Sequence, residues 1–277
     1  MRQPLRPLRP AAPRATALVT AVAFAFLALA CATVPGTGRS QIMFISDDQE
    51  MALGVQAYEE SLAEAQVVTS GADAAMVKRI GDRIAEAART YDDPAVRAKA
   101  AKFGWEFKLI KDDKTVNAWA LPGGKSAVYT GLLPITQDED GLAVVLGHEV
   151  AHAIASHGAE RMSHGLILDL GLSLGSKQLG EMTPGQQEAI MQGLGLGVML
   201  PFSRYHESEA DTLGLYLSAW AGYDPRASIG LWERMAAAGG GGTPEFLSTH
   251  PSESTRIADL QAIMPRALEL YEHSPQR

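Results

Sequence analysis

The chain has 277 residues, of which 46% are hydrophobic and 20% are charged, as is typical of a globular protein with one or two domains. Its formal net charge is −8, and residues 1–30 contribute four arginines and no acidic residue. The remainder is strongly acidic, which argues against a nucleic-acid partner because phosphate binding needs clustered lysines and arginines.

The N-terminal sequence has the order of a secretory signal peptide. Arginines and prolines alternate up to Arg14, and an apolar run follows from Ala15 to Ala30. A basic region, an apolar region and a small residue predict a signal peptide over residues 1–30. The run is short for a membrane span of about 20 apolar residues, so an uncleaved signal anchor is the alternative.

Cys31 is the only cysteine, which excludes a disulfide within the chain. Its position directly after the apolar run is similar to a bacterial lipobox, although Ala28 and Leu29 are exchanged relative to the usual pattern. We therefore expect Cys31 to be lipidated and the protein to be periplasmic, anchored by lipid to a membrane, most simply the outer membrane. The alternative is that Cys31 is merely a small residue that ends a hydrophobic segment.

The mature chain is expected to start with a tether over residues 31–45, followed by one folded domain over residues 46–277. Ser46 can cap a helix whose first turn is acidic, over about residues 47–66. A second helix is predicted over about residues 72–90, because its apolar residues recur at helical spacing.

The period changes to that of β-strands from Gly104 onward. Trp105, Phe107 and Leu109 alternate with polar residues, and further strands are expected over residues 116–120 and 126–130. The sequence thus predicts a small three-stranded sheet. An edge strand of such a sheet could bind an extended peptide through main-chain hydrogen bonds.

A helix after this sheet carries the most informative motif. Thr136 and Glu139 have the spacing of a capping box, which predicts the start of the helix. Its apolar stripe lies to one side of the two histidines and consists of Leu142, Leu146, Val150 and Ile154.

His148 and His152 are four residues apart on this helix, so both imidazoles can bind one Zn²⁺ at about 2.0–2.1 Å. Glu149 flanks such a metal and could accept a proton from an activated water molecule. A buried pair of core histidines is the alternative, but two histidines and a glutamate on one face would be costly to bury unpaired.

Catalytic zinc usually has three protein ligands, so a third is expected elsewhere. Glu207 and Asp211 share one face of a helix predicted to end near Ala221. If Glu207 binds zinc, Asp211 could accept a hydrogen bond from a ligand histidine and fix its tautomer. A solvated acidic helix face is the alternative for this segment.

Residues 162–202 contain eight glycines among leucines and methionines. Either a packed helical pair or a mobile segment near the site, able to contact membrane or substrate, would account for this composition. No repeat of 30–45 residues is present in the sequence, so no appended helical repeat array is expected.

These motifs together resemble the membrane-associated zinc metallopeptidases related to the CAAX prenyl proteases, in particular the bacterial BepA- and LoiP-like branch and the Oma-type mitochondrial peptidases. The resemblance covers about residues 36–262. Besides the two-histidine motif, the matching segments are Thr37-Gly38-Arg39, Asn117 to Gly124, Ser203-Arg204, Glu207 to Asp211, Ala221 to Pro225, and Thr249-His250-Pro251.

The resemblance implies a mostly helical α+β fold of the zincin, gluzincin type over residues 46–277. It implies one Zn²⁺ bound by His148, His152 and Glu207, with Glu149 as catalytic base and Asp211 as the partner of a ligand. Asn117, Ala118, Trp119 and Ala120 would bind the substrate strand. The implied activity is hydrolysis of peptide bonds in unfolded or misassembled envelope proteins, that is, protein quality control.

The other histidines carry weaker expectations. By the resemblance, His250 is either a removable fourth ligand or a donor to the oxyanion, and a capping or packing role is the alternative; it is expected at the start of the last long helix. Structural hydrogen bonding is expected for His206 and Arg204. His157 and His164 are expected at the surface or at the rim of the site.

Two other functions compete with the peptidase. One is a chaperone or adaptor that binds unfolded envelope proteins while His250 closes the metal site. The other is a purely structural zinc site, which is disfavoured because such sites usually have four Cys or His ligands and need no adjacent glutamate.

Overall fold

The computed structural model describes residues 31–165, 203–238, 245–250 and 255–277. The expected signal peptide and residues 166–202 of the glycine-rich segment lie outside these ranges. No helix within the described ranges is both long enough and apolar enough to span a membrane.

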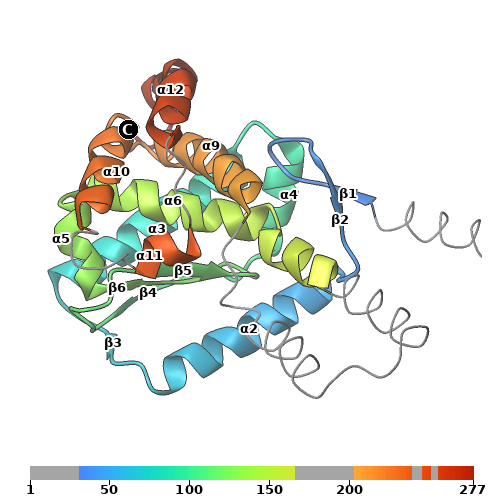
Figure 1. Cartoon of the computed structure of the whole chain (residues 1–277), viewed down its shortest axis with the longest axis horizontal. Helices are drawn as coiled ribbons and strands as arrows, with labels where there is room; N and C mark the ends of the chain where they lie inside the picture. Colours follow the sequence, from blue (N-terminus) through green and yellow to red (C-terminus); the bar gives the residue numbers. More distant parts are fainter. Residues whose placement is uncertain (1–30, 166–202, 239–244, 251–254) are drawn as a thin grey trace, which may run out of the picture.

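The elements confirm a mostly helical α+β fold (Figure 1). In chain order they are β1 (Cys31–Thr33), β2 (Ser40–Ile42), α2 (Asp47–Ala63), β3 (Val67–Val68), α3 (Ala72–Thr90), α4 (Pro94–Lys102), β4 (Glu106–Ile110), β5 (Ala118–Leu121), β6 (Lys125–Tyr129), the 3-10 helix η1 (Thr130–Leu132), α5 (Leu133–Thr136), α6 (Glu139–Ile154), α9 (Arg204–Trp220), α10 (Ala227–Ala238), α11 (Glu245–Thr249) and α12 (Arg256–Glu272).

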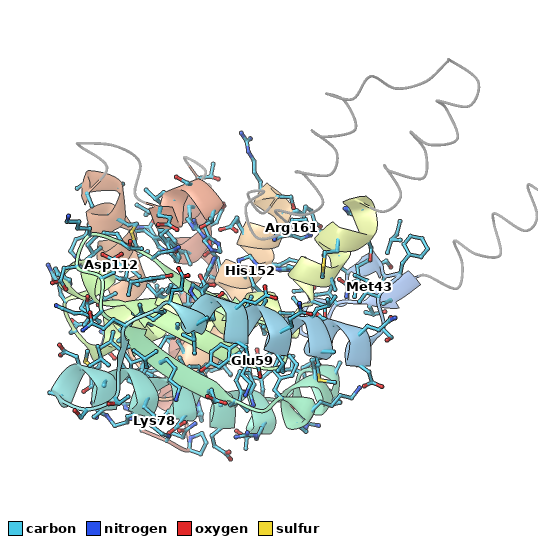
Figure 2. The ribbon with its side chains drawn as sticks, turned by 90° about the horizontal axis from the view of Figure 1, so that it is seen from below. Met43, Glu59, Lys78, Asp112, His152 and Arg161 are labelled. Carbon is cyan, nitrogen blue, oxygen red and sulfur yellow. The ribbon has the colours of Figure 1, made fainter. Side chains whose placement is uncertain are left out.

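Helix α6 lies at the centre of the molecule. It packs against α9, α3 and β5, and Figure 1 shows the sheet below it and α9, α10 and α12 above it. All four residues of the predicted apolar stripe are fully buried, which confirms the assignment of that face. His152 accordingly lies in the interior, whereas charged residues such as Glu59 and Lys78 lie outside (Figure 2).

The three predicted strands are present, but the sheet has a fourth strand. Its order is β3-β4-β6-β5, with β4 parallel to β6 and both β3 and β5 antiparallel to their neighbours. The two residues of β3 are too few to show an alternating pattern, so the sequence could not reveal this strand. Strand β5 is at one edge, as expected for a strand that could accept a peptide.

The predicted capping box at the start of α6 is wrong. Thr136 ends the short helix α5, which has a proline in its first turn, and Gln137 then adopts a positive φ of 68°. The N-cap of α6 is Asp138, whose side chain accepts a hydrogen bond of 2.8 Å from the Gly141 amide. By contrast, Ser46 does cap α2, together with Gln49.

Residues 31–45 are not a free tether. Strands β1 and β2 pair with each other, and Arg39 beside them forms ion pairs with Glu160 at 2.5 Å and Glu209 at 2.7 Å. Both carboxylates belong to the folded domain. The expectation failed because a short polar segment reads as a linker unless its distant charge partners are known.

Helices α6 and α9 cross in backbone contact. A Cβ atom added to Gly214 would lie 2.6 Å from the His148 amide nitrogen, and one added to Gly147 would lie 2.1 Å from Oγ of Ser218. Oγ of Ser218 also donates to the carbonyl of Ala143 at 2.8 Å. This close approach brings the acidic start of α9 next to the histidines of α6.

Candidate metal centre

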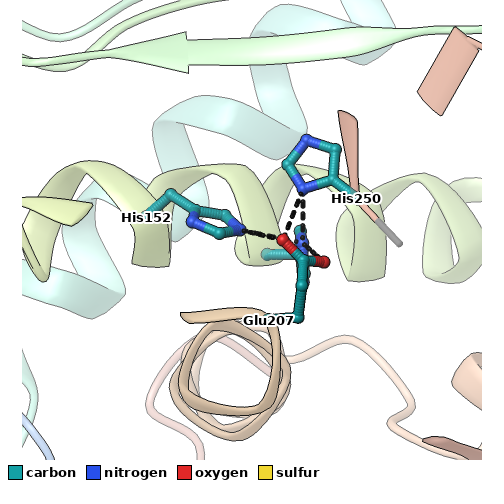
Figure 3. Close-up of side chains that lie close together, drawn as sticks. His152, Glu207 and His250 are labelled. Carbon is teal, nitrogen blue, oxygen red and sulfur yellow. Dashed lines mark hydrogen bonds and ion pairs between the residues drawn. The ribbon is translucent and has the colours of Figure 1, made fainter. Parts of the chain in front are cut away.

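Four side chains from three parts of the chain meet beside α6 (Figure 3). Helix α6 contributes His148 and His152, α9 contributes Glu207, and His250 follows directly after α11. Each has one donor atom within 4.8 Å of the others, and each is at most 3% exposed. The structure therefore brings together the predicted ligands and places the predicted His250 with them.

The spacing of the donor atoms suits a tetrahedral metal. Neighbouring donors around a tetrahedral zinc with bonds of about 2.0–2.1 Å lie about 3.3–3.4 Å apart. Nε2 of His148 is 3.1 Å from Nε2 of His152 and 3.4 Å from Oε2 of Glu207. Nδ1 of His250 is 3.3 Å from the same His148 nitrogen and 3.0 Å from Oε1 of Glu207. Three imidazole nitrogens and one carboxylate at this spacing fit Zn²⁺.

Asp211 lies where a partner of a ligand is needed. Its Oδ1 is 2.9 Å from Nδ1 of His148, one turn beyond Glu207 on α9. A hydrogen bond from this nitrogen leaves Nε2 with a lone pair that faces the other donors. Asp211 is therefore placed to keep a hydrogen on Nδ1 of His148.

Arg256 is a site residue that the sequence analysis missed. Its Nη2 donates to Oε2 of Glu207 at 3.0 Å, and its Nε donates to Oδ2 of Asp211 at 2.6 Å. The guanidinium also lies 3.6 Å from the ring centroid of Trp232. Arg256 is 45 residues from Asp211 and 49 residues from Glu207, so no local sequence pattern links them. Only the tertiary structure reveals these two ion pairs.

Glu149 is buried beside the four donors. Its Oε1 has no hydrogen-bond partner among the described residues, although Nε2 of His250 is 3.3 Å away. Burial raises the pKa of Glu149, because desolvation disfavours the carboxylate. A carboxylate in this environment is suited to accept a proton.

Burial and ion pairing act in opposite directions on the other groups. Burial disfavours the charged form of His148, but Asp211 and Glu207 outweigh it and raise the pKa of His148 to about 9. Burial lowers the pKa of His152. Burial would also raise the pKa of Glu207, yet hydrogen bonds from the histidines hold that pKa well below its usual range. Glu207 is therefore an anion that faces imidazole nitrogens.

The predicted substrate strand lies along this site. Residues Ala118–Leu121 form the edge strand β5, which packs against α6, and the backbone of Ala120 faces the carboxylate of Glu149. The Asn117 side chain instead donates to Glu245 at 3.1 Å and so holds the start of α11. Trp119 packs edge-on against Tyr58 at 6.0 Å.

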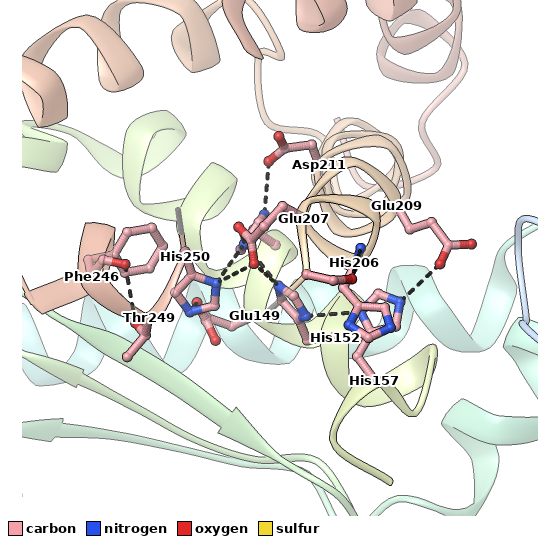
Figure 4. A network of polar contacts seen from close by, with 12 residues as sticks. Glu149, His152, His157, His206, Glu207, Glu209, Asp211, Phe246, Thr249 and His250 are labelled. Atoms are coloured by element: carbon pink, nitrogen blue, oxygen red, sulfur yellow. Dashed lines mark hydrogen bonds and ion pairs between the residues drawn. The ribbon is translucent and has the colours of Figure 1, made fainter. Parts of the chain in front are cut away.

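Three expectations about the remaining histidines can be compared with the structure. His157 is fully buried, so its placement at the surface or rim is wrong. His206 forms a buried hydrogen bond of 3.1 Å to Glu160, as expected of a structural residue. His250 lies at the end of α11 rather than at the start of α12 (Figure 4).

A cavity of about 630 Å³ lies beside α9 and α12. Glu207, Asp211 and Arg256 contribute to its wall, whereas His148, Glu149 and His152 do not. Glu149 thus does not line this cavity, and the backbone of Ala120 in β5 lies against its carboxylate.

Comparison with known proteins agrees with this geometry. The chain is 35% identical over 253 residues to the mitochondrial metalloendopeptidase OMA1 of Saccharomyces cerevisiae, which covers 87% of this chain and 71% of that protein. It is 44% identical over 165 residues to the Schizosaccharomyces pombe OMA1, covering 59% of this chain and 48% of that protein. It is 28% identical over 235 residues to the beta-barrel assembly-enhancing protease of Escherichia coli, covering 82% of this chain and 46% of that protein.

The matched region thus spans about half the length of two of these three relatives. The family model described as peptidase family M48 matches residues 72–264, a range that contains every donor of the candidate centre. Because this model and the budding yeast relative both cover most of the sequence, the chain belongs to peptidase family M48.

Proposed function

We propose that this protein is a zinc metalloendopeptidase. The observation that carries the proposal is the buried group of three imidazoles and one carboxylate, whose donor atoms lie within 4.8 Å of one another, with a second carboxylate, Glu149, beside it. The relatives whose names describe metalloendopeptidases support the same activity. Zinc, when bound, supplies a Lewis acid that polarises a carbonyl group and acidifies water.

The protein side chains have separate roles in this proposal. His148, His152 and Glu207 hold the zinc, and Asp211 orients His148. Glu149 accepts a proton from the attacking water at its carboxylate and delivers it to the nitrogen of the leaving amine. Its carboxylate is buried and its Oε1 accepts no hydrogen bond within the described residues, so it can take up a proton once the imidazole of His250, 3.3 Å away, withdraws.

The substrate is proposed to bind as an extended strand along β5. Strand β5 pairs only with β6 within the described sheet, and it packs on the helix that carries Glu149. Main-chain hydrogen bonds to residues 117–120 would hold a peptide without regard to its sequence. This mode requires an unfolded or misassembled segment, which suits a quality-control peptidase.

Nδ1 of His250 lies beside the other three donors, 3.3 Å from Nε2 of His148 and 3.0 Å from Oε1 of Glu207. If His148, His152 and Glu207 held zinc, this imidazole would take the position that catalytic zinc leaves open for water. We therefore propose that His250 is a removable ligand that closes the centre, in preference to an oxyanion donor.

The proposed location is the periplasm, with a lipid anchor at Cys31. The support is the sequence of residues 1–31, whose basic and apolar regions precede a single cysteine. Misassembled envelope proteins are then the proposed substrates, and the Escherichia coli relative is named a beta-barrel assembly-enhancing protease. The adaptor alternative has less support, because the named relatives are peptidases.

The test compares hydrolysis of casein, as an unfolded substrate, by the wild type and Glu149→Gln. Loss of the base should lower the rate by at least about 100-fold while the bound zinc stays at one per chain. Glu139→Gln, an exposed glutamate of the same helix, is the control and should leave both values unchanged. A zinc-loaded wild type with no cleavage, even after removal of the His250 imidazole, would favour the adaptor.

A further inference from the structure

A second polar cluster lies next to the metal centre, on its side toward the N-terminal segment. We call it the outer cluster: Arg39, His157, Glu160, His206 and Glu209. Arg39 bridges the two carboxylates, donating to Glu160 at 2.5 and 2.7 Å and to Glu209 at 2.7 Å. Within the cluster, Glu209 contacts His157 and Glu160 contacts His206, and these two imidazoles stack with centroids 4.5 Å apart.

The outer cluster contacts the metal centre through His157. Nδ1 of His157 lies 2.9 Å from Nδ1 of His152, and Nε2 of His157 lies 3.3 Å from Oε2 of Glu209 (Figure 4). His157 thus connects the outer cluster to the imidazole of His152.

A break in the helix places His157 there. Helix α6 ends at Ile154, and the next helical residues begin at His157. Ser156 between them has a positive φ of 57°, a conformation that non-glycine residues adopt rarely. Its hydroxyl donates to the buried Glu50 at 3.0 Å, which holds the break in place. The turn brings a residue five positions after His152 back to the same imidazole.

The distances allow only one arrangement of protons if His152 binds zinc through Nε2. Nδ1 of His152 then carries a hydrogen and must donate it. Nδ1 of His157 must be the acceptor, so the hydrogen of His157 lies on Nε2. That hydrogen points to Glu209, whose negative charge is balanced by Arg39. Every donor in this sequence of contacts meets an acceptor.

We propose that His157 is a positioning residue for the zinc ligand His152, held in the required tautomer by Glu209 and Arg39. The inference rests on the proposed role of His152 as a ligand. It also assigns a function to the Thr37-Gly38-Arg39 segment. Thr37 donates to Glu209 at 2.5 Å and Arg39 pairs with Glu209, so this segment holds the carboxylate that contacts His157. Partners of this kind orient a ligand imidazole and raise its basicity.

The first test observes the tautomers directly in the zinc-loaded wild type. Two-bond nitrogen–proton correlations of ¹⁵N-histidine-labelled protein distinguish Nδ1–H from Nε2–H. We expect His152 to be Nδ1–H and His157 to be Nε2–H. A doubly protonated His157 or an Nδ1–H tautomer of His157 would overturn the proposal, and this measurement needs no variant to fold.

The second test measures zinc affinity by competition with a chelator. His157→Phe keeps a ring but removes the acceptor, so zinc should bind about 10–100-fold more weakly. His157→Asn keeps an acceptor near the Nδ1 position and should restore most of that loss. Equal affinity in wild type and His157→Phe would overturn the proposal.

Glu160→Gln is the matched control, because it perturbs the same cluster through Arg39 and His206 without touching His157. We expect its zinc affinity to stay within about twofold of the wild type. A loss equal to that of His157→Phe would show a general loosening of the cluster and would refute the specific role. A wild type that binds no stoichiometric zinc would instead refute the proposed function, which separates the two failures.

Discussion

Nε2 of His250 lies 3.3 Å from Oε1 of Glu149, so the imidazole that is the proposed removable ligand also contacts the proposed general base. Its ring stacks on Phe246 at 4.6 Å, and its amide donates to the carbonyl of Phe246 at 2.9 Å. The side chain that closes the centre is therefore supported by α11, a separate short helix. Movement of α11 would free Glu149 and the fourth position together.

His250→Ala should raise the rate of casein cleavage. Removal of the imidazole opens the fourth corner, while His148, His152 and Glu207 still provide the three ligands of catalytic zinc. If the open state is a minority of about 0.1–10%, the rise should be on the order of tenfold or more. His273→Ala, an exposed histidine beyond α12, is the control. A fall in kcat at unchanged zinc content would contradict the closing role and indicate oxyanion stabilisation.

Asp211→Asn should weaken zinc binding by about 10-fold or more. The amide can still accept from Nδ1 of His148, but it leaves the buried Arg256 with one charged partner in place of two. The measurement is zinc competition with a chelator, alongside thermal unfolding of the metal-free protein. Asp259→Asn, an exposed residue of α12, controls for loss of charge. Unchanged affinity in Asp211→Asn would show that the negative charge of Asp211 does not support the metal centre.

Gly214→Ala should destabilise the fold by about 1–3 kcal/mol and reduce zinc binding. The new methyl group would lie 2.6 Å from the His148 backbone, so α9 must move away from α6 and take Glu207 with it. Urea unfolding and zinc content measure the two effects. Gly230→Ala is the control, because there the methyl group meets only the flexible end of Arg234. A stable, zinc-loaded Gly214→Ala protein would contradict the close crossing of the helices.

The stabilising effect of Glu160 should disappear in acid. Burial would raise the pKa of Glu160, but hydrogen bonds from Arg39 and His206 outweigh it and hold the pKa at about 2, below the ordinary value of 4.5. A lowered carboxyl pKa stabilises the fold above pH 4.5, and this contribution is lost as the pH falls toward 2. The difference in free energy of unfolding between wild type and Glu160→Gln should shrink across that interval. A constant difference would contradict the ion pair.

Local periodicity accounts for what could be predicted from the sequence. The two histidines and Glu149 are separated by fixed helical offsets, so their shared face follows from the geometry of one helix. The burial of Leu142, Leu146, Val150 and Ile154 follows from the same period. Strand alternation around Phe107 likewise predicted β4.

The errors occurred where a nonlocal contact or a local break replaced the regular pattern. Thr136 was assigned to the N-cap of α6, a role that Asp138 has instead, because Thr136 is the last residue of α5. His157 was placed at the surface because a regular continuation of α6 would carry it away from His152. The positive φ of Ser156 reverses that direction.

The sequence by itself determined that one helix presents two imidazoles and a carboxylate to a common point, since helical spacing is a local property. Only the tertiary structure decided which distant residues complete that point: Glu207 from α9, His250 after α11 and Arg256 from α12. These residues meet because α6 and α9 cross closely and because charged side chains pair across 40 or more residues of sequence. Neither feature produces a repeating pattern in the sequence, so neither could be predicted from it.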